Sequence, residues 1–199
     1  TMTRFAVLDF ETTGLSPNFG ARATEIGIVI LENGIVVDRY QSLMNSGVHI
    51  PYAVEQLTGI SNAMVRRAPP IDEVMSEAHR FVEGYDLVAH NAAFDSKFWN
   101  AEMCRIGIQT QPTFICTLLL ARRIFPDAPN HKLATLIRYL GLPSAAQYHR
   151  ALADAEATAQ FFHFMNLEVM KTFHIGSIDG ALYRCMQKAT KAKFEVAVK

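Results

Sequence analysis

The sequence lacks the features that mark disulfide-rich secreted proteins, zinc proteins and membrane proteins. Only three cysteines occur in 199 residues, and none lies in a CxxC pair or a cluster with histidine. An odd number of widely spaced cysteines argues against a disulfide framework and a zinc site, so we expect reduced thiols. No run approaches the roughly 18 apolar residues of a membrane span, and the start, TMTRFAVLDF, lacks a basic region followed by an apolar stretch. We therefore expect a cytoplasmic protein that does not contact membranes.

The sequence also lacks net charge, because its 19 basic and 19 acidic residues balance. Any attraction to a polyanion must therefore come from a local patch or from bound metal. With 50% hydrophobic residues, the chain can form one domain with a sizeable core. Residues 171–199 differ from the rest, because they carry six basic and two acidic side chains. We predict a domain over residues 1–172 and a basic, helical extension over 173–199, which either packs on the domain or contacts nucleic acid or a partner.

Apolar periodicity and turn signals predict an antiparallel meander followed by alternating helices and strands. The pair Asn33-Gly34 suits a tight hairpin turn between two of the strands. Strand patterns cover residues 4–10, 24–31, 35–43 and 86–90. Helical patterns cover about residues 71–84, 93–106, 132–140 and 150–170, and residues 114–125 combine a short strand with a helix. This order of elements indicates an α/β fold.

The first strand carries two acids in an otherwise apolar run, FAVLDFETTGL, residues 5–15. Because side chains alternate along a strand, Asp9 and Glu11 share one face and lie about 6.6 Å apart along it. Two adjacent carboxylates removed from water cost several kcal/mol per ion unless a cation lies between them. The two acids therefore favour a divalent metal site, although a strand that ends at Leu8 would leave both in solvent.

Two further stretches place an acid at the start of a helix in a mainly apolar setting. They are HNAAFD, residues 90–95, and HRALADAEAT, residues 149–158. Asp95 and Asp154 could each be ordinary helix-start residues, which the helix dipole favours. Four acids from three separate segments instead point to one shared metal site.

A histidine precedes the last of these acids by five positions. Five helical residues turn about 140° around the axis, so His149 and Asp154 do not share a helix face, and we expect His149 in the loop before the helix. From that loop it could reach a water that Asp154 helps to hold, and imidazole exchanges protons near neutral pH. The alternative is an exposed histidine without a role.

In this order and with these separations, LDFETTG, HNAAFD and the His149–Asp154 pair resemble the three motifs of the DEDDh exonucleases. This DnaQ-like group includes the epsilon subunit of DNA polymerase III, the exonuclease segment of PolC-type polymerases and ribonuclease T. The resemblance covers about residues 4–170. A further stretch, IPYAVEQLTGIS at residues 50–61, is similar to a segment of the PolC-like and stand-alone members. The resemblance implies a ribonuclease-H-like fold with a five-stranded mixed sheet, helices on both faces and the acids at one end.

The resemblance also implies an activity, which is metal-dependent 3′–5′ hydrolysis of DNA, expected to be single-stranded, with release of nucleoside monophosphates. Two divalent ions, Mg²⁺ or Mn²⁺, would stabilise the attacking and leaving oxygens. By the family pattern Asp9 contacts both ions, Glu11 and Asp154 hold one, Asp95 supports the other, and His149 is the general base. The same pattern assigns contacts with the terminal nucleotides to Thr12, Leu15, Leu57, Thr58, Asn91 and Phe94.

Several alternatives stay open at this stage. Ordinary core packing is the alternative for Leu15, Leu57 and Phe94. Thr58 stands where the epsilon subunit has a histidine, which favours a PolC-like or stand-alone enzyme over a proofreading subunit bound to a DNA polymerase. An RNA-trimming enzyme of the ribonuclease T type and a non-catalytic nucleic-acid-binding or polymerase-binding module are the other candidates. The chain could also act alone or with a second copy of itself.

Overall fold

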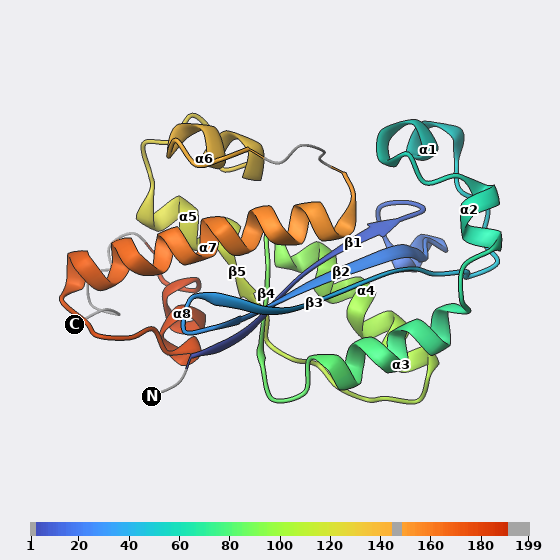
Figure 1. Cartoon of the computed structure of the whole chain (residues 1–199), viewed down its shortest axis with the longest axis horizontal. Helices are drawn as coiled ribbons and strands as arrows, with labels where there is room; N and C mark the ends of the chain where they lie inside the picture. The colour runs from blue at the N-terminus through green and yellow to red at the C-terminus, as the bar shows by residue number, and fades with distance from the viewer. Residues whose placement is uncertain (1–2, 145–148, 191–199) are drawn as a thin grey trace.

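The computed structural model describes residues 3–144 and 149–190, and its centre is a five-stranded mixed sheet (Figure 1). The strand order is β3-β2-β1-β4-β5. Strands β1 to β3 pair antiparallel, whereas β4 is parallel to β1 and β5 is parallel to β4. The strands are β1 Arg4–Thr12, β2 Ala23–Glu32, β3 Ile35–Leu43, β4 Asp86–Ala89 and β5 Ile115–Cys116. This topology confirms the predicted meander and mixed sheet.

The β2–β3 turn forms where the sequence predicts it. Asn33 and Gly34 both have positive φ, 51° and 80°, which is the backbone twist that joins two antiparallel strands tightly. Strand β1 runs two residues further than predicted, to Thr12, so both of its acids belong to the strand. The alternative in which the strand ends at Leu8 is therefore wrong.

The helices agree with the periodicity, with shifts of a few residues at their ends. Helix α3 stops at Phe81 rather than Gly84, whereas α7 continues to Phe173 instead of ending near residue 170. The helices are η1 Pro17–Phe19, α1 Tyr52–Thr58, α2 Asn62–Arg66, α3 Ile71–Phe81, α4 Ala92–Arg105, α5 Thr117–Ile124, α6 Leu133–Tyr139, α7 Ala151–Phe173 and α8 Gly180–Met186.

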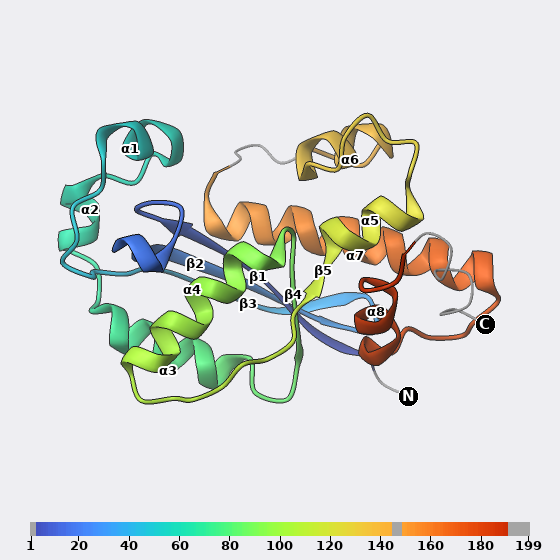
Figure 2. The same ribbon diagram turned by 180° about the vertical axis from the view of Figure 1, so that it is seen from behind.

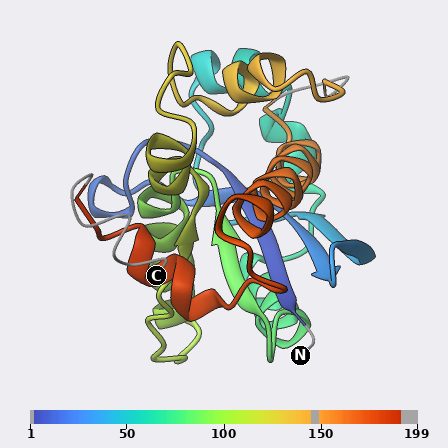
Figure 3. The same cartoon turned by 90° about the vertical axis from the view of Figure 1, so that its left-hand side faces the viewer.

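Two hydrophobic layers hold the helices on opposite faces of the sheet. Ala6, Leu8 and Phe10 of β1 pack with α3 and α4. In Figure 2, α4 crosses in front of the strands and α3 lies below them. Phe5 and Val7 point the other way and pack with α5, α6, α7 and α8. Figure 3 shows α7, in orange, along its axis on one side of the strands. The alternation predicted for β1 is confirmed, and it places Asp9 and Glu11 on the α7 face.

The segment after residue 173 contributes to the core on that face. Tyr183 and Met186 of α8 are fully buried, and Arg184 pairs with Asp86 of β4 at 3.0 Å. Within the described residues the helix of this segment covers 180–186, a shorter stretch than the predicted extension, and residues 191–199 lie outside the description. The division at residue 172 stays a prediction. Among the described residues, no helix is long and apolar enough to cross a membrane.

Candidate active site

Three of the predicted acids meet near the C-terminal end of β1 and the start of α7, two elements that Figure 1 shows close to one another. Asp9, Glu11 and Asp154 each offer one carboxylate oxygen, and these atoms all lie within 4.8 Å of one another. Helix α7 packs on the β1 face that carries Asp9 and Glu11, and it brings Asp154 in its first turn. Asp9 and Asp154 are 145 positions apart in the chain, yet with Glu11 they form one acidic cluster.

One oxygen of this cluster has no partner. Asp9 Oδ2 is buried and accepts no hydrogen bond from any described residue. Burial, followed by the charges of Asp95 and Glu11, raises the pKa of Asp9 well above its ordinary value. A buried, unpaired carboxylate oxygen is costly in a folded protein unless a ligand satisfies it. Hard oxygen donors from three acids are the ligand set that a divalent cation prefers, so these residues fit a metal ion.

Asp95 lies beside the cluster but is not one of this group of three. It sits in the first turn of α4, is almost completely buried, and its Oδ1 accepts a hydrogen bond of 3.0 Å from the backbone N–H of Phe10. Because Phe10 separates Asp9 from Glu11, this bond ties α4 to the strand between the two acids. Burial raises the pKa of Asp95 to about 8.

His149 lies in the loop before α7, as predicted from the five-residue spacing. Its backbone N–H donates to Asp154 Oδ2 at 3.2 Å, its φ is 66°, and its side chain is exposed. Burial raises the pKa of Asp154 to about 6, and the neighbouring His149 opposes that rise. The arrangement places an imidazole at the solvent edge of the acidic cluster.

Gly27 of β2 allows α7 to approach the sheet at this point. It pairs with Asp9 in the β1–β2 register. A Cβ atom at this position would lie 2.4 Å from the backbone nitrogen of Leu152 and 2.5 Å from the carbonyl carbon of Ala151. The first turn of α7 therefore rests on the glycine backbone, and this contact sets how close Asp154 comes to Asp9.

Sequence analysis missed two residues of the site, Glu25 and Arg150. Glu25 of β2 stands directly opposite Glu11 in the register and pairs with Arg150 at 2.8 Å. A signal was present in the sequence, because Glu25 interrupts the apolar strand TEIGIVIL as Asp9 interrupts the first strand. Arg150, which directly follows His149, gave no signal of its own.

Two of the residues predicted to contact the substrate have apolar side chains that are exposed to solvent. Leu15, in the loop after β1, is 85% exposed, and Leu57 of α1 is 59% exposed. Core packing is thus excluded for both. Thr58, in contrast, is buried, and its hydroxyl donates to the Val54 carbonyl and accepts from the Ile60 N–H, so it closes the end of α1. Contact of all three with substrate stays a prediction.

The remaining residues predicted to contact the substrate lie at the end of β1 and at the start of α4. The Thr12 hydroxyl donates to the Gly14 carbonyl at 2.7 Å, which leaves its backbone as the group available to a nucleotide. Asn91 is exposed, has a φ of 61°, and its side chain makes no capping bond to α4. Phe94 is half-buried with its ring 4.9 Å from that of Phe98, so core packing explains part of its surface.

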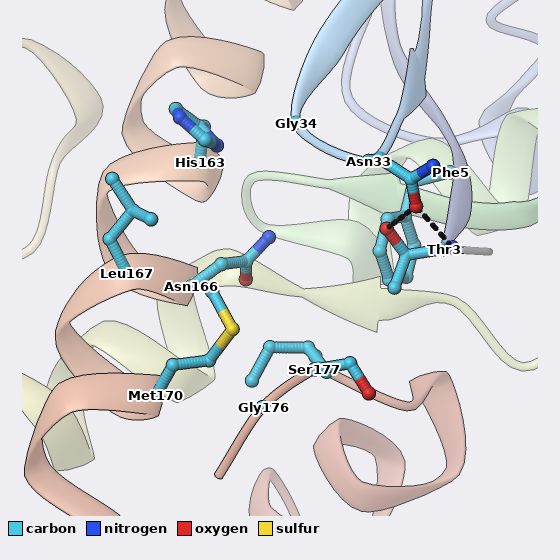
Figure 4. Close-up of a pocket in the computed structure, with 11 residues that line it drawn as sticks. Thr3, Phe5, Asn33, Gly34, His163, Asn166, Leu167, Met170, Gly176 and Ser177 are labelled. Atoms are coloured by element: carbon cyan, nitrogen blue, oxygen red, sulfur yellow. Dashed lines mark hydrogen bonds between the residues drawn. The ribbon is translucent and has the colours of Figure 1, made fainter. Parts of the chain in front are cut away.

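A separate cavity of about 220 Å³ lies at the other end of β1 (Figure 4). His163 and Asn166 of α7 face Asn33 of the β2–β3 turn across it. None of its lining residues is an acid. The cavity therefore lacks the ligands that the acidic cluster provides, and we place the active site at the cluster.

Comparison with known proteins agrees with this geometry. A family model described as exonuclease, named RNase_T, matches residues 6–162, which include all four acids and His149. The chain belongs to this exonuclease family. Its DEDDh motifs place it among 3′–5′ exonucleases, which are hydrolases, and the resemblance drawn from the three motifs is confirmed. A DEDDh exonuclease with this acidic cluster implies divalent metal ions.

The exonuclease chain is similar to segments of much longer proteins. It is 38% identical over 174 residues to the DNA polymerase III PolC-type protein of Caldanaerobacter subterraneus subsp. tengcongensis, covering 87% of this chain and 12% of that protein. It is 39% identical over 160 residues to the 3′-5′ exonuclease DinG of Bacillus subtilis, covering 80% of this chain and 17% of that protein. The chain thus spans less than a fifth of the length of these two relatives.

Solved structures of exonucleases share the fold. Exonuclease X in complex with 5′ overhanging duplex DNA has a TM-score of 0.68 and 26% identity, covering 90% of this chain and 99% of that chain. The E. coli ExoI–ssDNA complex has a TM-score of 0.76 over 94% of this chain and 44% of that chain, but at 15% identity it supports the fold alone. The predicted ribonuclease-H-like architecture is confirmed.

The metal-free exonuclease should lose stability as pH rises. Burial and neighbouring acids raise the pKa of Glu11 to about 9, and burial raises that of Asp95 to about 8, from ordinary values of 4.5 and 3.8. Between the ordinary and the raised values the folded chain holds protons that the unfolded chain has released, so the free energy of unfolding falls as pH increases. Thermal melts in chelator from pH 5 to 9 should show a falling Tm, and Mn²⁺ should raise Tm more at pH 9 than at pH 5. A flat profile would contradict the burial of these acids.

Proposed function

We propose that this chain is an active exonuclease that removes nucleoside monophosphates from the 3′ end of single-stranded DNA, with divalent metal ions and His149 as general base. The observation that carries the proposal is the acidic cluster, in which oxygens of Asp9, Glu11 and Asp154 lie within 4.8 Å and Asp9 Oδ2 is unpaired. A binding module would not need such a cluster, because four acids repel a phosphate backbone. The name of the 3′-5′ exonuclease DinG supports the direction of the reaction, and the complex of Exonuclease X with duplex DNA supports a DNA substrate.

The residues that would hold the metal are the four acids, with Asp9 central to them. We assign Asp9, Glu11 and Asp154 to one ion and Asp9 with Asp95 to a second, and we expect Mg²⁺ or Mn²⁺ because every donor is a carboxylate oxygen. Two such ions supply Lewis-acid stabilisation of the charge that develops on the phosphodiester oxygens. The raised pKa values of Glu11 and Asp95 mean that binding of a cation would release protons from the site.

The role of His149 is to accept a proton from the attacking water. Its side chain is exposed at the edge of the cluster, and its backbone N–H is fixed on the Asp154 carboxylate. An imidazole in this position can pass the proton on to bulk solvent after each cycle. The charge of His149 lowers the pKa of Asp154 against the effect of burial, so the two side chains interact electrostatically.

The terminal nucleotide would lie against the exposed leucines. Leu15 borders a recess of about 420 Å³ that Thr13, Phe19 and Val48 also line. Like Leu57, it presents apolar surface to solvent, and apolar surface favours the flat face of a base. We assign Asn91 and Phe94, at the start of α4, to the next nucleotide. The backbone at Thr12 would then meet the 3′ end itself.

A second candidate is the same chemistry as part of a DNA polymerase assembly. The similarity to PolC-type DNA polymerase III favours it, since the matched segment is 12% of that protein. The catalytic proposal is the same whether the chain is attached to a polymerase, acts alone or pairs with a second copy of itself. They differ in the partner that the purified chain would bind.

A competition between equal-length DNA and RNA oligonucleotides, labelled at the 5′ end, tests the proposal. We expect shortening from the 3′ end in Mg²⁺ or Mn²⁺, faster on DNA than on RNA, and none in excess chelator. Full activity in chelator would contradict a metal-dependent reaction, and a preference for RNA would make the chain an RNA-trimming enzyme. Tight binding with no product would identify a binding module instead.

A further inference from the structure

Glu25 forms the most completely hydrogen-bonded carboxylate near the acidic cluster. It is 1% exposed, and its Oε1 accepts from Arg150 Nε at 3.0 Å and from the backbone N–H of Ala151 at 2.9 Å. Its Oε2 accepts from Arg150 Nη2 at 2.8 Å and from Gln41 Nε2 at 3.3 Å. Both oxygens are therefore engaged, in contrast to the unpaired oxygen of Asp9.

These bonds make Glu25 unsuitable as a metal ligand although it lies opposite Glu11. A bidentate pair with a guanidinium is the strongest arrangement that a carboxylate forms with a side chain. The pair also balances a fifth acid beside the cluster with a positive charge. Glu25 thus serves a different purpose from the four acids.

Three of the four donors that reach Glu25 come from the two residues that follow His149. Arg150 directly follows His149, and Ala151 is the first residue of α7. The same short stretch is held on its other side by the His149 N–H, which donates to Asp154. Residues 149–151 are consequently fixed between a strand of the sheet and the first turn of the helix.

From this geometry we infer that Glu25 and Arg150 position the general base. The ion pair fixes Arg150, and with it the neighbouring His149, on β2, so that the imidazole stays at the edge of the acidic cluster. Neither residue touches the reacting atoms, and both act through His149. The role rests on the proposed function, because it assigns His149 the proton transfer.

Kinetics of Glu25→Gln and Arg150→Lys test the inference. Each substitution keeps the size of the side chain but removes the bidentate pair, and we expect kcat to fall roughly 10- to 100-fold, as for other residues that orient a catalytic group, with KM little changed. In a His149→Ala background the same substitutions should change kcat by less than about two-fold, because the group they position is gone. An equal loss in both backgrounds would overturn the inference.

A second readout needs neither metal nor activity. In chelator, NMR signals of the His149 ring, assigned by their absence in His149→Ala, should shift or broaden in Arg150→Lys and Glu25→Gln. The matched control is Arg22→Lys. Arg22 forms a bidentate pair with Glu102, at 2.7 and 2.9 Å, and this pair is also largely buried. It ties α4 to the residue before β2 and does not involve the residues around His149. The substitution should lower Tm to a similar extent and leave both the signals and kcat unchanged.

The two readouts separate this inference from the proposed function. Full activity of His149→Ala would remove the proposed role of the base, yet the ring signals would still report whether Glu25 and Arg150 hold it. Unchanged ring signals in both folded variants would overturn the positioning role, whatever the kinetics. Arg150→Lys retains the positive charge on a single donor nitrogen, so it tests the inference even if Glu25→Gln does not fold.

Discussion

Replacing Asp9 by asparagine should lower the rate of 3′ end shortening by about 10³-fold or more, because it removes the acid on which the proposed site depends. Asp9 interacts with the charges of the other three acids, and its Oδ2 is buried without a partner among the described residues. Asparagine has nearly the same shape but carries no charge and only one oxygen. The fold should therefore survive while cation binding fails. The measurement is shortening of a 5′-labelled single strand in Mg²⁺ or Mn²⁺.

Stability gives an independent check on the same substitution. Because burial and neighbouring acids raise the pKa of Asp9, an uncharged residue there should make the metal-free chain more stable at pH 8 than the parent. Addition of Mn²⁺ should raise the Tm of the parent chain but not that of Asp9→Asn. The matched control is Asp72→Asn, at an exposed acid in the first turn of α3, which should not raise the stability of the metal-free chain and should leave the Mn²⁺ response unchanged. Activity of Asp9→Asn near the parent level would move the reaction away from the acidic cluster.

The features that sequence predicts well in this protein are those with a local cause. The period of two along β1 separates Leu8 and Phe10 from the two acids, and the structure places them on opposite faces. The five-residue spacing excludes a shared helix face for His149 and Asp154, and the helix begins between them. The Asn33-Gly34 turn follows from backbone preferences alone.

The features that sequence does not predict depend on contacts between distant segments. Glu25 and Arg150 are 125 positions apart, and only the approach of α7 to β2 makes them partners. The buried Thr58 hydroxyl and the exposed Leu57 side chain are neighbours in a helix, so their opposite surroundings depend on how α1 sits on the domain. Residues 191–199, which carry part of the basic charge, lie outside the described structure.

Gly27 should be the position where one added methyl group has the largest effect on both stability and activity. The Cβ of an alanine there would lie 2.4 to 2.5 Å from backbone atoms of Ala151 and Leu152, which no side-chain rotation can relieve. Helix α7 would have to move away from β2. Overpacking of this kind costs about 3 kcal/mol, which corresponds to a fall in Tm of roughly 6–12 °C for a chain of this size.

The same movement should carry Asp154 and His149 away from Asp9. Misplacement of catalytic groups by about 1 Å costs on the order of 10²-fold in rate, so Gly27→Ala should retain a folded core yet lose most of its activity below its lowered Tm. Gly176→Ala is the matched control, because a Cβ at that position meets no atom within 4 Å. It should leave both Tm and rate near the parent values. If Gly27→Ala kept the parent rate, the distance between α7 and β2 would not control the site, and the cluster would have to tolerate a displaced Asp154.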